Sequence, residues 1–161
     1  MLGTPESAAQ PTMQDTTTAD TSVWNATEFE PGSPSYEYLA SRGFYRRRAE
    51  GAGWFVTRRE PAFARSNWIG DILRAAPGVS VVERDGQTLV FSGRSARACL
   101  LAIFSDGVYT SSRDLGSFAA DDILALEVYR GAAGLPVEFR PTRFDRRCGA
   151  LLIWSRVTLD D

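Results

Sequence analysis

The chain lacks two residue types on which enzyme and metal chemistry often depend. It contains no His and no Lys, so all 18 of its basic residues are Arg. Without His, the commonest general base and metal ligand is missing. Two Cys in 161 residues are too few for a Cys-rich metal site. We therefore expect no enzymatic activity, no cofactor and no bound metal.

Long apolar runs are missing as well. No stretch approaches the roughly 20 apolar residues that a membrane-spanning helix needs. Met1 is not followed by a basic region and then an apolar one, so we recognise no signal peptide. A length of 161 residues suffices for one domain and a tail. We expect one domain with no transmembrane segment of its own.

Charge and composition divide the chain into three parts. Residues 1–40 carry a net charge of −6, whereas residues 41–161 carry +4. Residues 1–34 are rich in Thr, Ser, Ala, Pro, Asp and Gln and have no periodicity, which predicts a disordered tail. Residues 35–53 form an Arg-rich lead-in, and we expect residues 54–161 to form the main domain.

Hydrophobic periodicity in the lead-in and domain predicts two or three helices and about six strands. Helices are expected at 36–48 and 58–76, the second introduced by the capping-box pattern Thr57 to Glu60. Asp85-Gly86 and Asp106-Gly107 predict hairpin turns. Because helices and strands do not alternate strictly, the fold class is α+β with a mixed sheet. The strands are expected at 54–56, 79–83, 87–91, 98–104, 124–129 and 150–157.

Four turn-marked segments follow one another in the last hundred residues. They are residues 69–79, which end in Pro77-Gly78-Val79, residues 102–108, which contain Asp106-Gly107, residues 126–131 (LEVYRG) and residues 148–156 (CGALLIWSR). In this order they resemble the plug domain of TonB-dependent outer-membrane receptors, which carries "dlL…vPGV", "liDGvp", "IEVlRG" and "GvInIiTk". The resemblance runs from Trp54 to Arg156. It implies a plug-like fold and a place in the cell envelope.

The densest basic cluster is Arg46, Arg47 and Arg48. The segment 44–60 resembles a lead-in, "FyrRRrrGfGrFiTreeI", that precedes the plug helix in a sub-group of plug-containing proteins, although Pro61 departs from that pattern. The cluster predicts either a basic patch for nucleic acid, anionic lipid or an acidic partner, or a solvated helix face paired with Glu50 and Glu60. We favour the solvated face.

A short segment of the tail resembles the TonB box of the same receptors. Asp20, Thr21, Val23 and Ala26 match its "D-T-x-x-V-x-A" pattern. In the receptors this box pairs as an added strand with the energising protein TonB, a mode in which main-chain hydrogen bonds supply the affinity. The resemblance implies the same role for these four residues.

The two cysteines allow two interpretations. Cys99 and Cys148 each open a predicted strand, and if these strands are neighbours in register a disulfide is possible. Such a bond would close a loop of about 50 residues and contribute about 3–4 kcal/mol. The alternative is a pair of buried free thiols in a reducing cytosol. We favour the disulfide because the family resemblance implies an oxidising compartment.

The leading hypothesis is a non-enzymatic plug-type module of the periplasm or outer membrane, resembling the part of the receptors that occludes or gates a barrel. Only five residues follow Arg156, whereas a 22-stranded barrel needs about 10 residues per strand, so we expect the module without its barrel. Its expected partner is an outer-membrane β-barrel or a TonB-like periplasmic protein. The alternatives are a periplasmic protein-binding adaptor and an Arg-rich nucleic-acid binder that stacks bases on Tyr45, Trp54 and Phe55.

Overall fold

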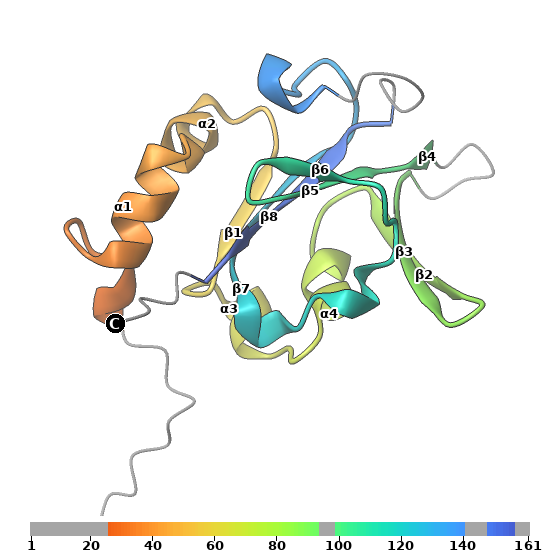
Figure 1. The fold of residues 1–161 in the computed structure, drawn as a ribbon, viewed down its shortest axis with the longest axis horizontal. Helices are drawn as coiled ribbons and strands as arrows, with labels where there is room; N and C mark the ends of the chain where they lie inside the picture. The colour runs from red at the N-terminus through yellow and green to blue at the C-terminus, as the bar shows by residue number, and fades with distance from the viewer. Residues whose placement is uncertain (1–25, 94–98, 141–147, 157–161) are drawn as a thin grey trace, which may run out of the picture.

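The computed structural model describes residues 26–93, 99–140 and 148–156 (Figure 1). The predicted α+β class is confirmed. The α-helices are α1 (Pro34–Ser41), α2 (Phe44–Glu50), α3 (Pro61–Ala64) and α4 (Ile69–Arg74). Short 3₁₀ helices are η1 (Ala26–Phe29), η2 (Leu115–Ser117), η3 (Ala120–Asp122) and η4 (Val137–Phe139).

Eight strands in the described residues form two sheets. A five-stranded sheet has the order β1-β7-β8-β5-β6, in which only β5 and β8 are parallel, and a three-stranded antiparallel sheet has the order β2-β3-β4. The strands are β1 (Trp54–Thr57), β2 (Val79–Arg84), β3 (Gln87–Ser92), β4 (Cys99–Leu100), β5 (Ala102–Ser105), β6 (Val108–Thr110), β7 (Ile123–Tyr129) and β8 (Ala150–Ser155).

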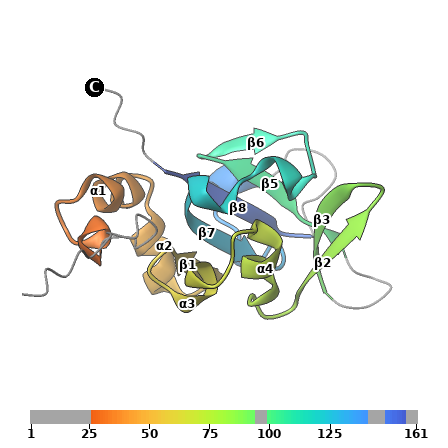
Figure 2. The same cartoon turned by 90° about the horizontal axis from the view of Figure 1, so that it is seen from below.

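Both faces of the five-stranded sheet are buried. Alternate residues of β8 point to opposite faces, so that Leu151 and Ile153 join one hydrophobic core while Leu152 and Trp154 join the other. Helices α3 and α4 and the β2–β3 hairpin close the first core, whereas α1, α2 and the segment around η4 close the second. Figures 1 and 2 place α1 and the β2–β3 hairpin at opposite ends of the molecule.

The helix predicted at 36–48 is two helices. Gly43 adopts φ 74° between α1 and α2, a left-handed conformation that interrupts helical hydrogen bonding. The first helix also begins earlier, at Pro34, where the Ser33 hydroxyl accepts a hydrogen bond from the amide of Tyr36. Folded structure extends back at least to Ala26, so part of the predicted tail (26–34) is ordered; residues 1–25 lie outside the described residues.

The helix predicted at 58–76 is also divided, into α3 and α4. Glu60 takes the N-cap position and Pro61 the first helical position, so the helix starts later than the capping-box pattern predicted. Trp68 is extended, with φ −135° and ψ 133°, and pairs with Ala119, which breaks the helix before α4. The side-chain contact of the pattern is present, because the Glu60 carboxylate accepts a hydrogen bond from the Thr57 amide.

The apolar run predicted as one central strand at 98–104 changes sheets at Leu101. The amide of Leu101 donates to Val90 of the three-stranded sheet, and the next amide, of Ala102, donates to Gly149 beside β8. Both predicted Asp-Gly turns are confirmed, since Asp85 and Asp106 have φ 52° and 51° and link β2 to β3 and β5 to β6.

Candidate functional site

The four motif segments come together around β7 and β8. The LEVY residues 126–129 lie in β7, which pairs antiparallel with β8, and β8 pairs in parallel with β5 of the Asp-Gly hairpin. The Pro-Gly-Val segment leads into β2 of the neighbouring sheet. Residues spread over 88 positions of sequence, from 69 to 156, thereby form one continuous region.

Gly149 allows a close backbone contact between two of these segments, residues 148–156 and 126–131. Its φ is +91°, and a Cβ atom at this position would collide with the carbonyl oxygen of Tyr129 and lie 2.6 Å from the amide nitrogen of Gly131. Both obstacles are backbone atoms, which cannot rotate away as a side chain can. The residue at position 149, where the chain passes the end of β7 and enters β8, must therefore be glycine.

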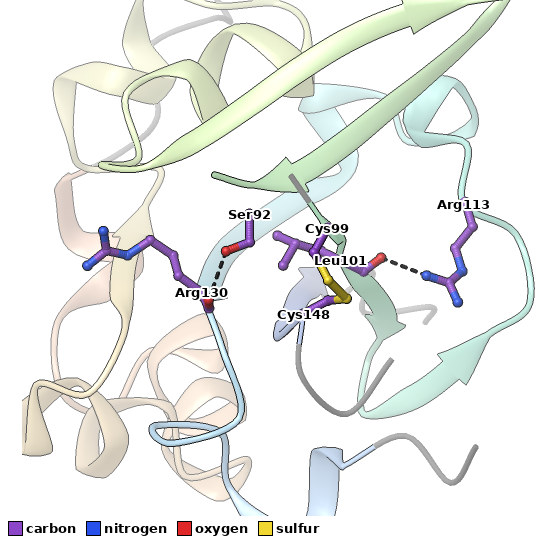
Figure 3. Close-up of a disulfide and its surroundings, with 6 residues drawn as sticks. All are labelled: Ser92, Cys99, Leu101, Arg113, Arg130 and Cys148. Atoms are coloured by element: carbon purple, nitrogen blue, oxygen red, sulfur yellow. Dashed lines mark hydrogen bonds between the residues drawn. A yellow bond between two sulfur atoms is a disulfide. The ribbon is translucent and has the colours of Figure 1, made fainter. Parts of the chain in front are cut away.

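Gly78 and Arg130 form a second contact between motifs. Gly78 has φ +69°, and a Cβ atom on it would lie 2.6 Å from a terminal nitrogen of the Arg130 guanidinium. The hydroxyl of Ser92, at the end of β3, donates a hydrogen bond of 2.8 Å to the Arg130 carbonyl (Figure 3). The side chain of Arg130 is exposed, so this junction presents a cation at the surface.

A disulfide between Cys99 and Cys148 links the two sheets beside this junction (Figure 3). Cys99 begins β4 of the three-stranded sheet, and Cys148 lies two residues before β8 of the five-stranded sheet, with their Cα atoms 5.1 Å apart. The second half of the strand predicted at 98–104 is β5, which is a neighbour of β8, but Cys99 itself lies in β4 of the other sheet. The bond joins the sheets where the chain crosses between them at Leu101.

A fully buried carboxylate, Glu127, is the polar centre of the second core. Arg47 approaches it bidentately, with Nε 2.9 Å from one oxygen and the terminal nitrogen 2.6 Å from the other. The Tyr129 hydroxyl and the Trp154 indole donate to the same two oxygens at 2.8 and 2.7 Å. The carboxylate thus accepts four hydrogen bonds, about the number its lone pairs allow.

The same network shifts the ionisation of its members. Burial alone would lower the pKa of Arg47, but the hydrogen bonds and charge of Glu127 raise that pKa above its ordinary value. Burial, and then the neighbouring charge of Glu127, raise the pKa of Tyr129 far above its ordinary value. The Arg47 guanidinium therefore stays charged and the Tyr129 phenol stays neutral, so the network holds α2 against β7 through hydrogen bonds.

The predicted basic patch at Arg46, Arg47 and Arg48 needs correction at its middle member. The side chain of Arg47 is only 3% exposed, because it turns inward from α2 to Glu127. Arg46 and Arg48 remain at the surface, each beside a carboxylate, Arg46 with Glu50 at 2.9 Å and Arg48 with Glu60 at 2.6 Å. No continuous tri-arginine surface exists here.

The stacking residues of the nucleic-acid alternative are largely occupied. Phe55 and Tyr45 both make edge-to-face contacts with buried Phe44, at centroid distances of 5.6 and 5.3 Å, and Trp54 packs against the first core. Of these three aromatic residues, Tyr45 lines a pocket of about 270 Å³. It is lined by Phe29, Tyr45, Arg48, Thr57, Arg59 and Glu60.

The TonB-box-like residues are mostly beyond what the structure describes. Asp20, Thr21 and Val23 lie outside the described residues, and Ala26 is the first residue of η1. Across the described ranges, no group of three or more His, Cys, Asp and Glu side chains is arranged to hold a metal ion. None of the helices in those ranges combines the length and apolar character that crossing a membrane would require.

Sequence reasoning missed the Arg47–Glu127 pair and the inter-sheet position of the disulfide. Glu127 stands in an otherwise apolar strand, ILALEVY, all of whose residues are buried. A charged residue inside such a run signals a buried counter-ion, because an unpaired charge would be very costly there. The sequence does not identify which of 18 arginines supplies it.

Comparison with known proteins finds similarity only among solved structures. No protein-family model and no curated protein matches the chain. A complex of FpvAI with pyocin S2 matches with a TM-score of 0.45 and 20% identity over 65% of this chain. Pseudomonas aeruginosa FpvA bound to a heterologous pyoverdine matches with a TM-score of 0.46 and 19% identity over 67% of this chain. A double mutant of the Serratia marcescens hemophore receptor HasR, in complex with its hemophore HasA and heme, matches with a TM-score of 0.46 and 11% identity over 66% of this chain.

These solved structures are TonB-dependent receptors. The chain spans 14%, 14% and 17% of their respective lengths. At such identities and TM-scores the likeness carries no argument about function, which has to rest on the motifs and on the contacts between them.

Proposed function

We propose that this chain is a non-enzymatic plug-type module of the bacterial envelope, resembling the part of TonB-dependent receptors that occludes or gates an outer-membrane barrel. The observation that carries the proposal is the meeting of the four motif segments around β7 and β8. Gly149 passes the backbone of β7, and Arg130 packs on Gly78 of the Pro-Gly-Val segment. The motif residues thus have physical reasons to occur together.

The lead-in belongs to the same folded unit as the rest of the module. Leu39 and Phe44 are fully buried in the core that contains Trp154, and Arg47 supplies the counter-ion of Glu127. We therefore place the lead-in, residues 35–53, in one cooperative domain with the described residues between Trp54 and Arg156. A sequence boundary at residue 54 would separate a buried charge from its partner.

The disulfide supports a place in the envelope. Disulfides persist in oxidising compartments such as the bacterial periplasm and are rare in the cytosol. The Cys99–Cys148 bond holds two sheets together and is a structural link. It favours the envelope proposal over a cytosolic nucleic-acid binder.

The carboxylates nearest the motifs have structural partners, which supports a non-enzymatic role. Asp106 accepts hydrogen bonds from the Tyr38 hydroxyl at 2.7 Å and the Ser155 amide at 2.8 Å. Asp121 lies 3.1 Å from the guanidinium of Arg58. With Glu127 held by Arg47, these groups fix the positions of helices and strands.

A periplasmic adaptor that captures a partner through its tail is the second candidate, favoured by the match at Asp20, Thr21, Val23 and Ala26. Strand addition depends on backbone amides, so a proline within the match should weaken it. Ala26 begins η1, so pairing that includes this residue would require η1 to unwind.

The test uses the full oxidised chain and the purified periplasmic domain of TonB from the native host of this protein. Binding is measured by surface plasmon resonance for the wild type, Val23→Pro and the matched control Thr17→Pro, which lies upstream of the segment. Binding that is lost in Val23→Pro and kept in Thr17→Pro supports a TonB-coupled module. Equal binding by all three rules out the TonB-box assignment.

A further inference from the structure

The pocket of about 270 Å³ lies where the lead-in meets the main domain, and we call it the lead-in pocket. Its side chains come from η1, α2, the end of β1 and the turn before α3: Phe29, Tyr45, Arg48, Thr57, Arg59 and Glu60. Two of the six are aromatic and the other four are polar or charged. Small-molecule sites commonly enclose about 300–1,000 Å³. The lead-in pocket therefore suits a ligand of one or two rings.

The Tyr45 hydroxyl is buried and has no hydrogen-bond partner among the described residues. The charges of Arg48, Glu60 and Arg59 all act on this phenol, so its oxygen lies among the lining side chains. Burial first, and then the neighbouring Tyr36, raise the pKa of Tyr45 to about 12, so the phenol keeps its proton at neutral pH. A buried hydroxyl without a partner is costly, and Phe would fill the same space without that cost. Tyr45 therefore holds an unused hydrogen-bond donor at the pocket.

The charged side chains of the pocket also leave donors unused. The Glu60 carboxylate is occupied, because it accepts hydrogen bonds from Arg48 at 2.6 Å and from the amide and hydroxyl of Thr57. Arg48 uses one of its five N–H groups in this contact. Arg59 lies 3.5 Å from Glu30 in an exposed pair. Two Arg and one Glu give the lining a net charge of +1, and its remaining capacity is to donate.

We propose that the lead-in pocket binds a small aromatic carboxylate. The carboxylate oxygens accept hydrogen bonds from the Tyr45 hydroxyl and from the guanidinium groups of Arg48 and Arg59, while the ring packs against Phe29. A donor-rich site of charge +1 matches a group that carries one negative charge and two acceptor oxygens. The inference goes beyond the proposed plug-type function and is independent of it, because it rests on the lining of this pocket alone.

A ligand enters at the charged rim of the pocket. The side chains of Arg48 and Arg59 are 42% and 51% exposed, and both are long and flexible. Because the Tyr45 oxygen is covered, one of these side chains has to turn before a ligand oxygen reaches it. Tyr45 itself is held by its ring, which stacks on Tyr36 with the centroids 4.6 Å apart. Binding should therefore rearrange the rim and leave the aromatic wall in place.

Binding of 4-fluorobenzoate to the full oxidised chain, followed by fluorine NMR, tests the proposal. The expected Kd is about 1 mM, as for a ligand of one ring. The neutral probe 4-fluorobenzamide has the same ring and nearly the same size, and it should bind at least about tenfold more weakly because it lacks the charge. Equal binding of the two probes overturns carboxylate recognition. No binding of 4-fluorobenzoate at about ten times the expected Kd overturns the site itself.

A matched pair of tyrosine variants tests the role of the unpartnered hydroxyl. Tyr45→Phe should weaken binding of 4-fluorobenzoate about tenfold, because it removes a hydrogen bond to a charged group. Tyr36→Phe removes the hydroxyl of the stacked neighbour, which does not line the pocket, and should bind like the wild type. Tyr45→Phe should also unfold at no lower temperature than the wild type, since its hydroxyl has no protein partner to lose.

A matched pair of arginine variants tests the charge at the rim. Arg59 and Arg46 each lie in an exposed ion pair with a glutamate, but only Arg59 lines the pocket. Arg59→Met should weaken binding about fivefold, and Arg46→Met should leave it unchanged. An affinity that is unchanged in Tyr45→Phe or Arg59→Met, or that falls equally in the matched controls, overturns the pocket as the binding site. Circular dichroism confirms that each variant is folded.

Discussion

Arg47 and Glu127 form a bidentate ion pair inside the protein although 80 positions separate them in the sequence. Their side chains are 3% and 0% exposed. The Arg47 guanidinium also lies 5.2 Å from the centroid of the Phe139 ring and 5.7 Å from that of Trp154. The pair therefore fixes α2 to the centre of the five-stranded sheet through both charge and aromatic contact.

Replacing one partner of this pair should be strongly destabilising. Arg47→Met leaves Glu127 buried without its counter-ion, which costs about 3–5 kcal/mol. Urea unfolding of the wild type, Arg47→Met, Glu127→Gln and the double variant measures the effect. The double variant should lose less than the sum of the single losses, since the neutral Gln removes the unpaired buried charge that Arg47→Met leaves.

Arg46→Met is the matched control for Arg47→Met. Arg46 lies on the same helix in an exposed pair with Glu50, with side chains 64% and 54% exposed. Its loss should cost no more than about 0.5 kcal/mol. Equal effects of the two substitutions would contradict the assigned role of Arg47.

Gly149 should be nearly intolerant of substitution. Gly149→Ala combines a left-handed backbone conformation with a collision against the Tyr129 carbonyl oxygen, and the expected loss is at least about 4 kcal/mol. Gly86→Ala is the control, because Gly86 has φ +76° with open space around it, and should cost about 1–2 kcal/mol. Thermal unfolding followed by circular dichroism compares the two, and similar midpoints would refute the close approach.

The disulfide should stabilise the oxidised chain substantially. Its removal in the double variant Cys99→Ser, Cys148→Ser frees a loop of about 50 residues and should lower the free energy of unfolding by about 3–4 kcal/mol. Reduction of the wild type should produce a loss of similar size, whereas the same reductant should leave the double variant unchanged. If the reductant also destabilised the double variant, the loss of unfolding free energy on reduction would have some cause other than the disulfide.

Alkaline pH should destabilise the protein through its buried tyrosines. Burial first, and then the nearby charge and hydrogen bond of Asp106, raise the pKa of Tyr38 to about 12. A phenol whose pKa is higher in the folded state binds its proton more tightly there, so its contribution is complete below about pH 10 and is lost as pH rises toward 12.

This dependence is tested by measuring the free energy of unfolding between pH 8 and 12, roughly the range that these pKa values define. Tyr38→Phe and Tyr129→Phe should each show a smaller alkaline loss than the wild type, because the raised pKa of each phenol is removed. Tyr109→Phe is the control, since Tyr109 is 46% exposed. A wild type whose stability stays constant across this range would refute the linkage.

Local signals in the sequence predicted part of the fold correctly. Asp85-Gly86 and Asp106-Gly107 specify their turns by themselves, because both positions need positive φ. Strands β7 and β8 were predicted nearly to their ends because apolar runs define them. The divided helices were missed, since Gly43 lowers helical propensity without fixing a break and Trp68 is extended by a pairing with distant Ala119.

Long-range partners were beyond sequence reasoning. The identity of the arginine that neutralises Glu127 depends on how α2 packs in three dimensions. The placement of Cys99 in a different sheet from β8 depends in the same way on how β4 packs. Arg47 was grouped with Arg46 and Arg48 because the three are consecutive. Helix α2 points consecutive side chains in different directions, and only one faces the sheet.

The most direct test of the central claim is a blot of fractionated cells of the native host, with each sample run both unheated and heated. An envelope plug-type module should appear in the outer-membrane fraction as an unheated band far above 17.7 kDa that collapses on heating. It should also resist thiol-blocking reagents until it is reduced. A cytosolic band at 17.7 kDa with reactive thiols would contradict both the envelope assignment and the disulfide.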